Sequence, residues 1–106
     1  MSRLVRDGKV AVLVSPGYGA GWYTWNKEFP ECLFDADIAK IVLGEVVGNI
    51  EDVAYEKYGE EFYLGGFDQL KVEWVLIGDR FRIKEYDGSE SLILAEDDDW
   101  HIAEAE

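Results

Sequence analysis

Residues 4–14 decide the fold, and their sequence is Leu4-Val5-Arg6-Asp7-Gly8-Lys9-Val10-Ala11-Val12-Leu13-Val14. Asp7-Gly8 is a strong signal for a two-residue turn, so the stretch predicts a β-hairpin. The second strand is apolar on both faces, because valines at alternate positions are separated by Ala11 and Leu13. This pattern is typical of a central strand that other elements cover on both sides.

Two short helices are predicted after the hairpin. The first covers residues 35–44, with Asp35 as its N-cap and Gly44 as its stop. The second begins near Asn49, another capping residue, and ends near Gly59. Apolar residues recur at helical spacing within both segments, which predicts one buried face for each helix.

Alternating apolar and polar residues in the last third predict a three-stranded meander with turns at Gly78-Asp79 and Asp87-Gly88. The sequence therefore predicts one α+β domain over residues 1–95. Its antiparallel sheet combines the N-terminal hairpin with the C-terminal meander, and two helices pack on one face. The predicted core includes Val12, Ile41, Val53, Trp74, Phe81 and Ile83.

Acidic residues dominate the charge of the chain. Among 106 residues, 10 are basic and 23 acidic, which gives a net charge of −13. Direct binding to nucleic acid or to an anionic membrane surface needs a cationic surface, so we expect neither. A basic partner would instead be attracted. Residues 96–106 form a predicted acidic C-terminal tail without lysine or arginine.

No catalytic pattern is recognisable. The single histidine, His101, lies in the acidic tail, and the single cysteine, Cys32, excludes an internal disulfide and suits a reducing compartment. We expect Cys32 to act as a small buried hydrophobe. Asp97-Asp98-Asp99 with His101 would hold a hard cation only weakly, and no metal-site spacing is present. The sequence predicts a non-enzymatic protein without a cofactor or a metal.

A glycine-rich loop is the most specific feature, with the sequence Ser15-Pro16-Gly17-Tyr18-Gly19-Ala20-Gly21. Alternating glycines expose backbone N–H groups, and the aromatic rings beside them suit a planar ligand that carries a phosphate. The spacing matches neither the dinucleotide fingerprint nor the phosphate loop. The alternative is a tight crossing loop whose aromatic residues belong to the core.

Arginines would supply the positive charge that such a ligand requires. Arg80, Arg82 and Lys84 share one face of a predicted strand, although they could instead pair with neighbouring carboxylates. We predict that a ligand is bound by residues of the loop and by at least one arginine. The candidates are Arg6, Gly17, Tyr18, Gly19, Gly21, Trp22, Tyr23, Trp25, Arg80 and Arg82.

Two parts of the chain resemble a group of small proteins encoded by phages and prophages. The first runs from Val5 to Asn26 and contains Ser15-Pro16-Gly17-Tyr18-Gly19-Ala20-Gly21-Trp22-Tyr23-Thr24-Trp25-Asn26. The second comprises Val72-Glu73-Trp74-Val75 and Phe81-Arg82-Ile83-Lys84-Glu85-Tyr86-Asp87-Gly88-Ser89-Glu90. The resemblance implies an accessory, counter-defence protein that acts in the cytoplasm of the host bacterium. It carries over no functional residue.

Two function hypotheses follow. In the first, the chain sequesters a small, anionic, nucleotide-like ligand at a concave site formed by residues 17–25. In the alternative, it is an acidic decoy that occupies the basic nucleic-acid-binding surface of a host defence protein. The decoy would use the tail and the carboxylates Glu51, Asp52, Glu56, Glu60 and Glu61. We also expect a homo-oligomer, because four tryptophans and six tyrosines exceed what so small a domain readily buries.

Overall fold

The fold is α+β, as predicted. This computed structural model describes residues 3–19 and 21–95, and the predicted acidic tail lies outside them. The elements are β1 (Val5–Arg6), β2 (Lys9–Val14), the 3-10 helices η1 (Tyr23–Trp25) and η2 (Pro30–Phe34), α1 (Ala36–Val42), α2 (Ile50–Tyr58), the 3-10 helix η3 (Phe67–Gln69), β3 (Lys71–Leu76), β4 (Phe81–Tyr86) and β5 (Ser89–Leu94).

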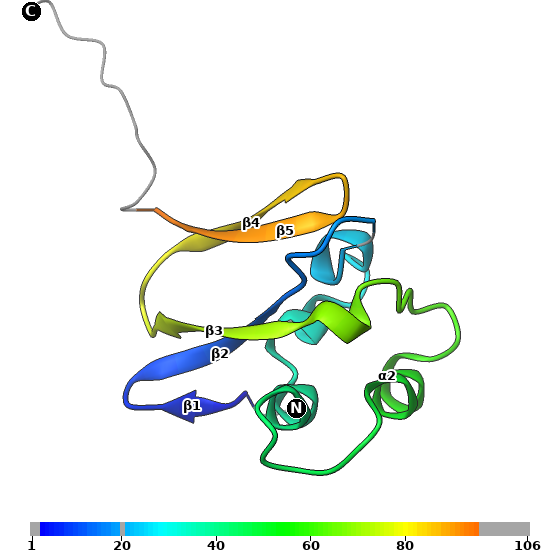
Figure 1. The fold of residues 1–106 in the computed structure, drawn as a ribbon. Helices are drawn as coiled ribbons and strands as arrows, with labels where there is room; N and C mark the ends of the chain where they lie inside the picture. Colours follow the sequence, from blue (N-terminus) through cyan, green and yellow to red (C-terminus); the bar gives the residue numbers. More distant parts are fainter. Residues whose placement is uncertain (1–2, 20, 96–106) are drawn as a thin grey trace, which may run out of the picture.

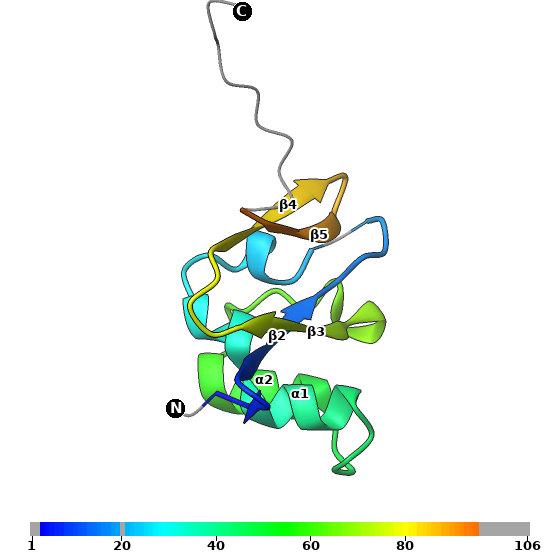
Figure 2. The ribbon, with the colours of Figure 1, turned by 90° about the vertical axis from the view of Figure 1, so that its left-hand side faces the viewer.

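These elements form three layers. Figure 1 shows the β4–β5 hairpin above, the antiparallel sheet β1-β2-β3 in the middle and the two helices below. The same order is visible from the side in Figure 2. Both faces of the central sheet are therefore covered, one by the helices and the other by the hairpin.

Strand β2 is the centre of the structure. Ala11 and Leu13 point to the helical side and join one core cluster, while Val12 and Val14 point to the hairpin and join a second. All four side chains are buried, which confirms the prediction of a central strand covered on both sides. Alternation of side chains along a strand explains how one strand serves two cores.

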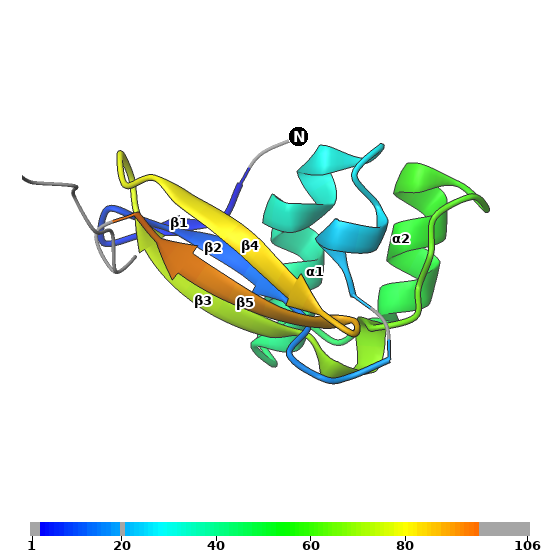
Figure 3. The same cartoon turned by 90° about the horizontal axis from the view of Figure 1, so that it is seen from above.

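The predicted C-terminal meander is wrong in one respect. β3 pairs antiparallel with β2, with Val10 opposite Val75, whereas β4 and β5 form a separate two-stranded sheet. Gly78-Asp79 therefore connects two layers instead of closing a hairpin. Seen from above, β4 and β5 lie over the central sheet (Figure 3). The second apolar face of β2 favours this arrangement, because a single continuous sheet would leave that face in water.

The predicted helix caps are confirmed. The carboxylate of Asp35 accepts a hydrogen bond from the Ile38 N–H (3.0 Å) at the start of α1. The side chain of Asn49 accepts one from the Asp52 N–H (3.2 Å) at the start of α2. These bonds satisfy amide groups that have no partner within the helix.

Asp35 also joins the two helices. Its buried carboxylate accepts hydrogen bonds from Lys57 Nζ (3.0 Å) and the Tyr58 hydroxyl (2.6 Å), both on α2. Burial and the hydrogen bond to Asp35 raise the pKa of the Tyr58 hydroxyl. Cys32 is buried as predicted, and burial raises the pKa of its thiol.

The predicted core residues take different positions. Val12 is fully buried, and the others are partly buried. Val53 and Trp74 pack against the helical-side cluster, and Phe81 and Ile83 pack against the hairpin-side cluster. Ile41 instead lines a surface pocket. No helix within the described residues is long and apolar enough to cross a membrane.

Candidate functional site

The glycine-rich loop packs on the turn of the β4–β5 hairpin. The Gly19 N–H donates to the carbonyl of Asp87 (2.8 Å), and the Ser89 hydroxyl donates to the carbonyl of Pro16 (2.6 Å). Two segments that are about seventy residues apart in the sequence are thus held side by side. The glycine-rich loop and the β4–β5 turn therefore meet at one place in the fold.

Glu90 of β5 fills the inside of this loop. One of its carboxylate oxygens accepts a hydrogen bond from the Ser15 N–H (3.0 Å). The other accepts from the Trp22 N–H (2.8 Å), the Thr24 N–H (2.9 Å) and the Thr24 hydroxyl (2.6 Å). Glu90 is almost completely buried. The loop therefore does surround an anionic group with backbone donors, but in this structure the anion is the chain's own carboxylate.

Two glycines of the loop lie close to side chains of other residues. A Cβ atom at Gly21 would lie 2.4 Å from Thr24 Oγ1 and 2.9 Å from a carboxylate oxygen of Glu90. A Cβ atom at Gly17 would lie 1.1 Å from the side-chain oxygen of Gln69. The Gln69 side chain is exposed and could turn away, so of these two glycines only Gly21 has a structural reason to be glycine that involves no ligand.

The aromatic residues that follow the loop divide into two groups. Trp22 is fully buried, its Nε1 donates to the carbonyl of Cys32 (2.9 Å), and its ring packs edge-on against Phe62. Tyr23 is partly buried and packs against both core clusters. Tyr18 and Trp25 are exposed. Trp22 and Tyr23 are therefore core residues here, as in the alternative interpretation of this segment.

Two of the three candidate arginines, Arg6 and Arg80, lie away from the loop. Both terminal nitrogens of Arg6 on β1 bond to the carboxylate of Glu45, which lowers the pKa of that carboxyl group. Arg80 is exposed, and its carbonyl accepts from the Ala95 N–H at the open end of the hairpin, opposite the turn that holds the loop. Arg82 is exposed on β4. A ligand site at the loop remains a prediction, and its ligand would have to displace Glu90.

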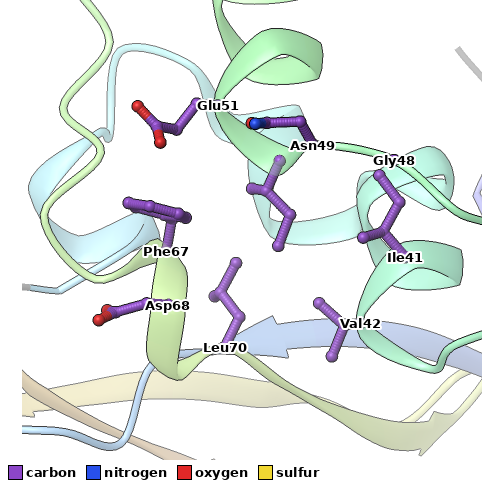
Figure 4. Close-up of a pocket in the computed structure, with 9 residues that line it drawn as sticks. Ile41, Val42, Gly48, Asn49, Glu51, Phe67, Asp68 and Leu70 are labelled. Carbon is purple, nitrogen blue, oxygen red and sulfur yellow. The ribbon is translucent and has the colours of Figure 1, made fainter.

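A pocket of about 410 Å³ lies elsewhere, between α1, α2 and η3. Its lining combines apolar side chains with Asn49 and two carboxylates, Glu51 and Asp68. Figure 4 shows Phe67 between the side chains of Glu51 and Asp68, with Ile41 and Val42 across the pocket. The lining residues are Ile41, Val42, Gly48, Asn49, Ile50, Glu51, Phe67, Asp68 and Leu70.

Local structure sets these side chains in place. The Asn49 cap fixes the start of α2, so that Ile50 packs inward and Glu51 follows at the rim. The short helix η3 presents Phe67 and Asp68 next to each other. Leu70 packs against the helical-side cluster, so the floor of the pocket continues into the core.

The segment that supplies the two carboxylates of the pocket is strongly acidic. Residues 45–68 contain seven acids and only one base, Lys57. Lys57 is bound to Asp35 (3.0 Å) and Asp37 (2.7 Å). Although burial lowers the pKa of Lys57, its hydrogen bonds to Asp37 and Asp35 outweigh that effect and raise it. We name the exposed or half-exposed acids the acidic helical face: Glu45, Glu51, Asp52, Glu56, Glu60, Glu61 and Asp68.

The pocket suits a long cationic side chain. An aliphatic stem can lie on apolar walls while a charged head stays at the water boundary, and a cation is attracted both by carboxylates and by the face of an aromatic ring. The N-terminus of α2 adds about half a positive charge nearby, but the full negative charges of Glu51 and Asp52 outweigh it. Among the described residues no cluster of histidine, cysteine and carboxylate side chains could hold a metal ion.

The sequence indicated only part of this pocket. The sequence predicts a decoy surface that includes the carboxylates of the second helix. It does not mark Phe67, Asp68 and Leu70 as functional residues. They belong to η3 and the turn before β3, where no periodic pattern marks them. The fold alone brings them to α1 and α2.

Comparisons with known proteins give no relative. No family model matches the chain, and no curated protein or solved structure is detectably similar to it.

Proposed function

We propose that this chain is a binding protein whose acidic helical face holds a cationic segment of a partner protein, with one arginine or lysine side chain in the pocket between α1, α2 and η3. The observation that carries this proposal is an open pocket in which the ring of Phe67 and aliphatic side chains lie beside the carboxylates of Glu51 and Asp68. A charged surface alone would favour any cation, whereas this pocket favours a cation on an aliphatic stem.

The free energies of the individual interactions favour a site that combines carboxylates with an apolar wall. A solvent-exposed ion pair contributes only about 0–1 kcal/mol, so scattered surface carboxylates would bind weakly. Burying the three or four methylene groups of an arginine or lysine stem adds roughly 2–3 kcal/mol, at about 0.8 kcal/mol for each group. The remaining carboxylates of the acidic helical face would speed association with a basic partner.

The resemblance to phage-encoded proteins suggests a setting for this activity. In that setting the partner is a host defence protein, and its cationic segment belongs to a surface that otherwise binds nucleic acid. The chain then acts as a non-enzymatic decoy in the bacterial cytoplasm. Glu90 inside the glycine-rich loop supports this hypothesis over sequestration of a nucleotide, because it already uses the donors that a phosphate would need.

A titration with a labelled oligo-arginine peptide tests the proposal. The pocket variant combines Glu51→Gln with Asp68→Asn. Its matched control combines Asp7→Asn with Asp87→Asn, which removes the same charge at two exposed turn positions of positive φ, where asparagine fits well. We expect the pocket variant to weaken binding about tenfold and the control less than about twofold.

Two outcomes would contradict the proposal. Equal losses in both variants would mean that the peptide responds only to net charge. Failure of the wild-type chain to bind the peptide, together with binding of a cyclic or linear nucleotide that is lost in Gly19→Val, would favour the ligand site at the loop.

A further inference from the structure

We propose that two copies of this chain associate through an apolar groove on the hairpin side of the central sheet. The groove has a volume of about 310 Å³ and lies at the open end of the β4–β5 hairpin. It is separate from the pocket on the helical side, so the inference does not rest on the proposed function.

The groove exists because the hairpin covers only part of the sheet. Val5, Val10 and Val75 form one row across β1, β2 and β3, since Val5 is opposite Val10 and Val10 is opposite Val75. Val75 is buried under the hairpin, Val10 is partly covered, and Val5 is 49% exposed. A continuous apolar row thus runs from the core into solvent.

Aromatic and aliphatic side chains complete the groove. The rings of Phe34 and Phe81 pack edge-to-face, 6.1 Å apart, and both residues line it. Leu76 and Ile77, at the end of β3, are 50% and 63% exposed. An exposed group of large apolar residues next to a core is typical of an interface.

The charges near the groove favour a second copy over a basic partner. Bases and acids are equal in number here among the described residues, although the whole chain carries −13. The four residues are Arg3, which lines the groove and pairs with Glu31, and Asp79, which lines the groove and is followed by Arg80. Two acidic chains can therefore approach each other at this surface with little local repulsion, whereas a cationic protein would be attracted to the acidic helical face.

The two charges next to the groove also suit a two-fold interface. Asp79 lines the groove and Arg80 follows it directly. In a symmetric dimer the same patch meets itself, so Asp79 of each copy can face Arg80 of the other. The groove lies on the sheet face that points away from the helices, and the dimer leaves both acidic helical faces open.

Sedimentation velocity of the full chain over a range of micromolar concentrations tests this inference. We expect a monomer–dimer equilibrium that Ile77→Glu weakens about tenfold or more. Val47→Glu is the matched control, because it places the same charge at a fully exposed valine on the helical side, and it should change the equilibrium less than about twofold.

Charge exchange tests the symmetry. Arg80→Asp should weaken the dimer, and adding Asp79→Arg in the same chain should restore it, because the reciprocal pairs are then exchanged. A wild-type monomer would overturn the inference, as would equal effects of Ile77→Glu and Val47→Glu. A truncated chain that ends at Ala95 provides a further test. If this truncated chain formed a dimer and the full chain did not, the inference would be overturned, because residues 96–106 would then occupy the groove in the full chain.

Discussion

Glu90 is the residue on which the interpretation of the glycine-rich loop depends. Its two oxygens accept four hydrogen bonds from Ser15, Trp22 and Thr24, which lie in or just after the glycine-rich loop. A buried carboxylate without partners would be very costly, but here the donors replace the water that burial removes. The same donors are then unable to bind a phosphate at the same time.

We predict that Glu90→Gln destabilises the fold by about 1–3 kcal/mol, because the amide N–H₂ group would face a backbone N–H group at one of the two sites. Urea denaturation of both proteins would measure the loss. The control is Glu28→Gln, which removes an exposed carboxylate. A Glu90→Gln protein as stable as the wild type would show that the loop does not depend on this anion.

Three groups with raised pKa values predict how stability depends on high pH. Cys32, Tyr58 and Lys57 have ordinary pKa values of 9.0, 10.0 and 10.5, and the fold raises all three. Above these values the unfolded chain releases protons that the folded chain retains. The free energy of unfolding should therefore be unaffected by these groups below about pH 9 and fall as pH rises from 9 to 11.

Tyr58→Phe should make this fall shallower, because phenylalanine has no proton to release. Thermal unfolding at a series of pH values would provide the measurement. A free energy of unfolding that increased between pH 9 and 11 would be incompatible with the buried environments of these side chains.

At the scale of elements, the contact between α1 and α2 depends on Asp35. Its carboxylate caps α1 and holds Lys57 and Tyr58 of α2. We predict that Asp35→Ala costs roughly 2–4 kcal/mol, because it removes a cap and leaves two partly buried donors without this partner. Asn49→Ala, which removes only a cap, should cost about 1 kcal/mol. Equal losses in urea denaturation would mean that the link to α2 contributes nothing.

Local signals predicted most elements of this fold. The Asp7-Gly8 and Asp87-Gly88 turns, the helix caps Asp35 and Asn49, and the two apolar faces of β2 are each encoded within a few residues. The separation of the C-terminal strands into two layers is not encoded locally, because Gly78-Asp79 suits either a hairpin or a crossover. Only the need to cover both faces of β2 decides between them.

At the scale of the whole molecule, charge and apolar surface are unevenly distributed. Most of the acidic helical face belongs to α2 and the segments next to it, whereas the apolar groove is lined mainly by the hairpin side of the central sheet with Phe34 and Phe81. The sequence predicted a surplus of acid and of aromatic residues but not their positions. Trp22 illustrates the difficulty, since a tryptophan after a glycine-rich loop suits a ligand site and a core equally well, and only the three-dimensional packing buries it.

The central claim is that the pocket between α1, α2 and η3 receives a cationic side chain. An amide-resolved NMR titration of the full chain with the oligo-arginine peptide tests it most directly. We predict that the largest shifts occur at Ile50, Glu51, Phe67, Asp68 and Leu70, and that Glu51→Gln with Asp68→Asn reduces them. Largest shifts at Gly17, Gly19 and Gly21, or equal small shifts at every exposed carboxylate, would contradict the claim.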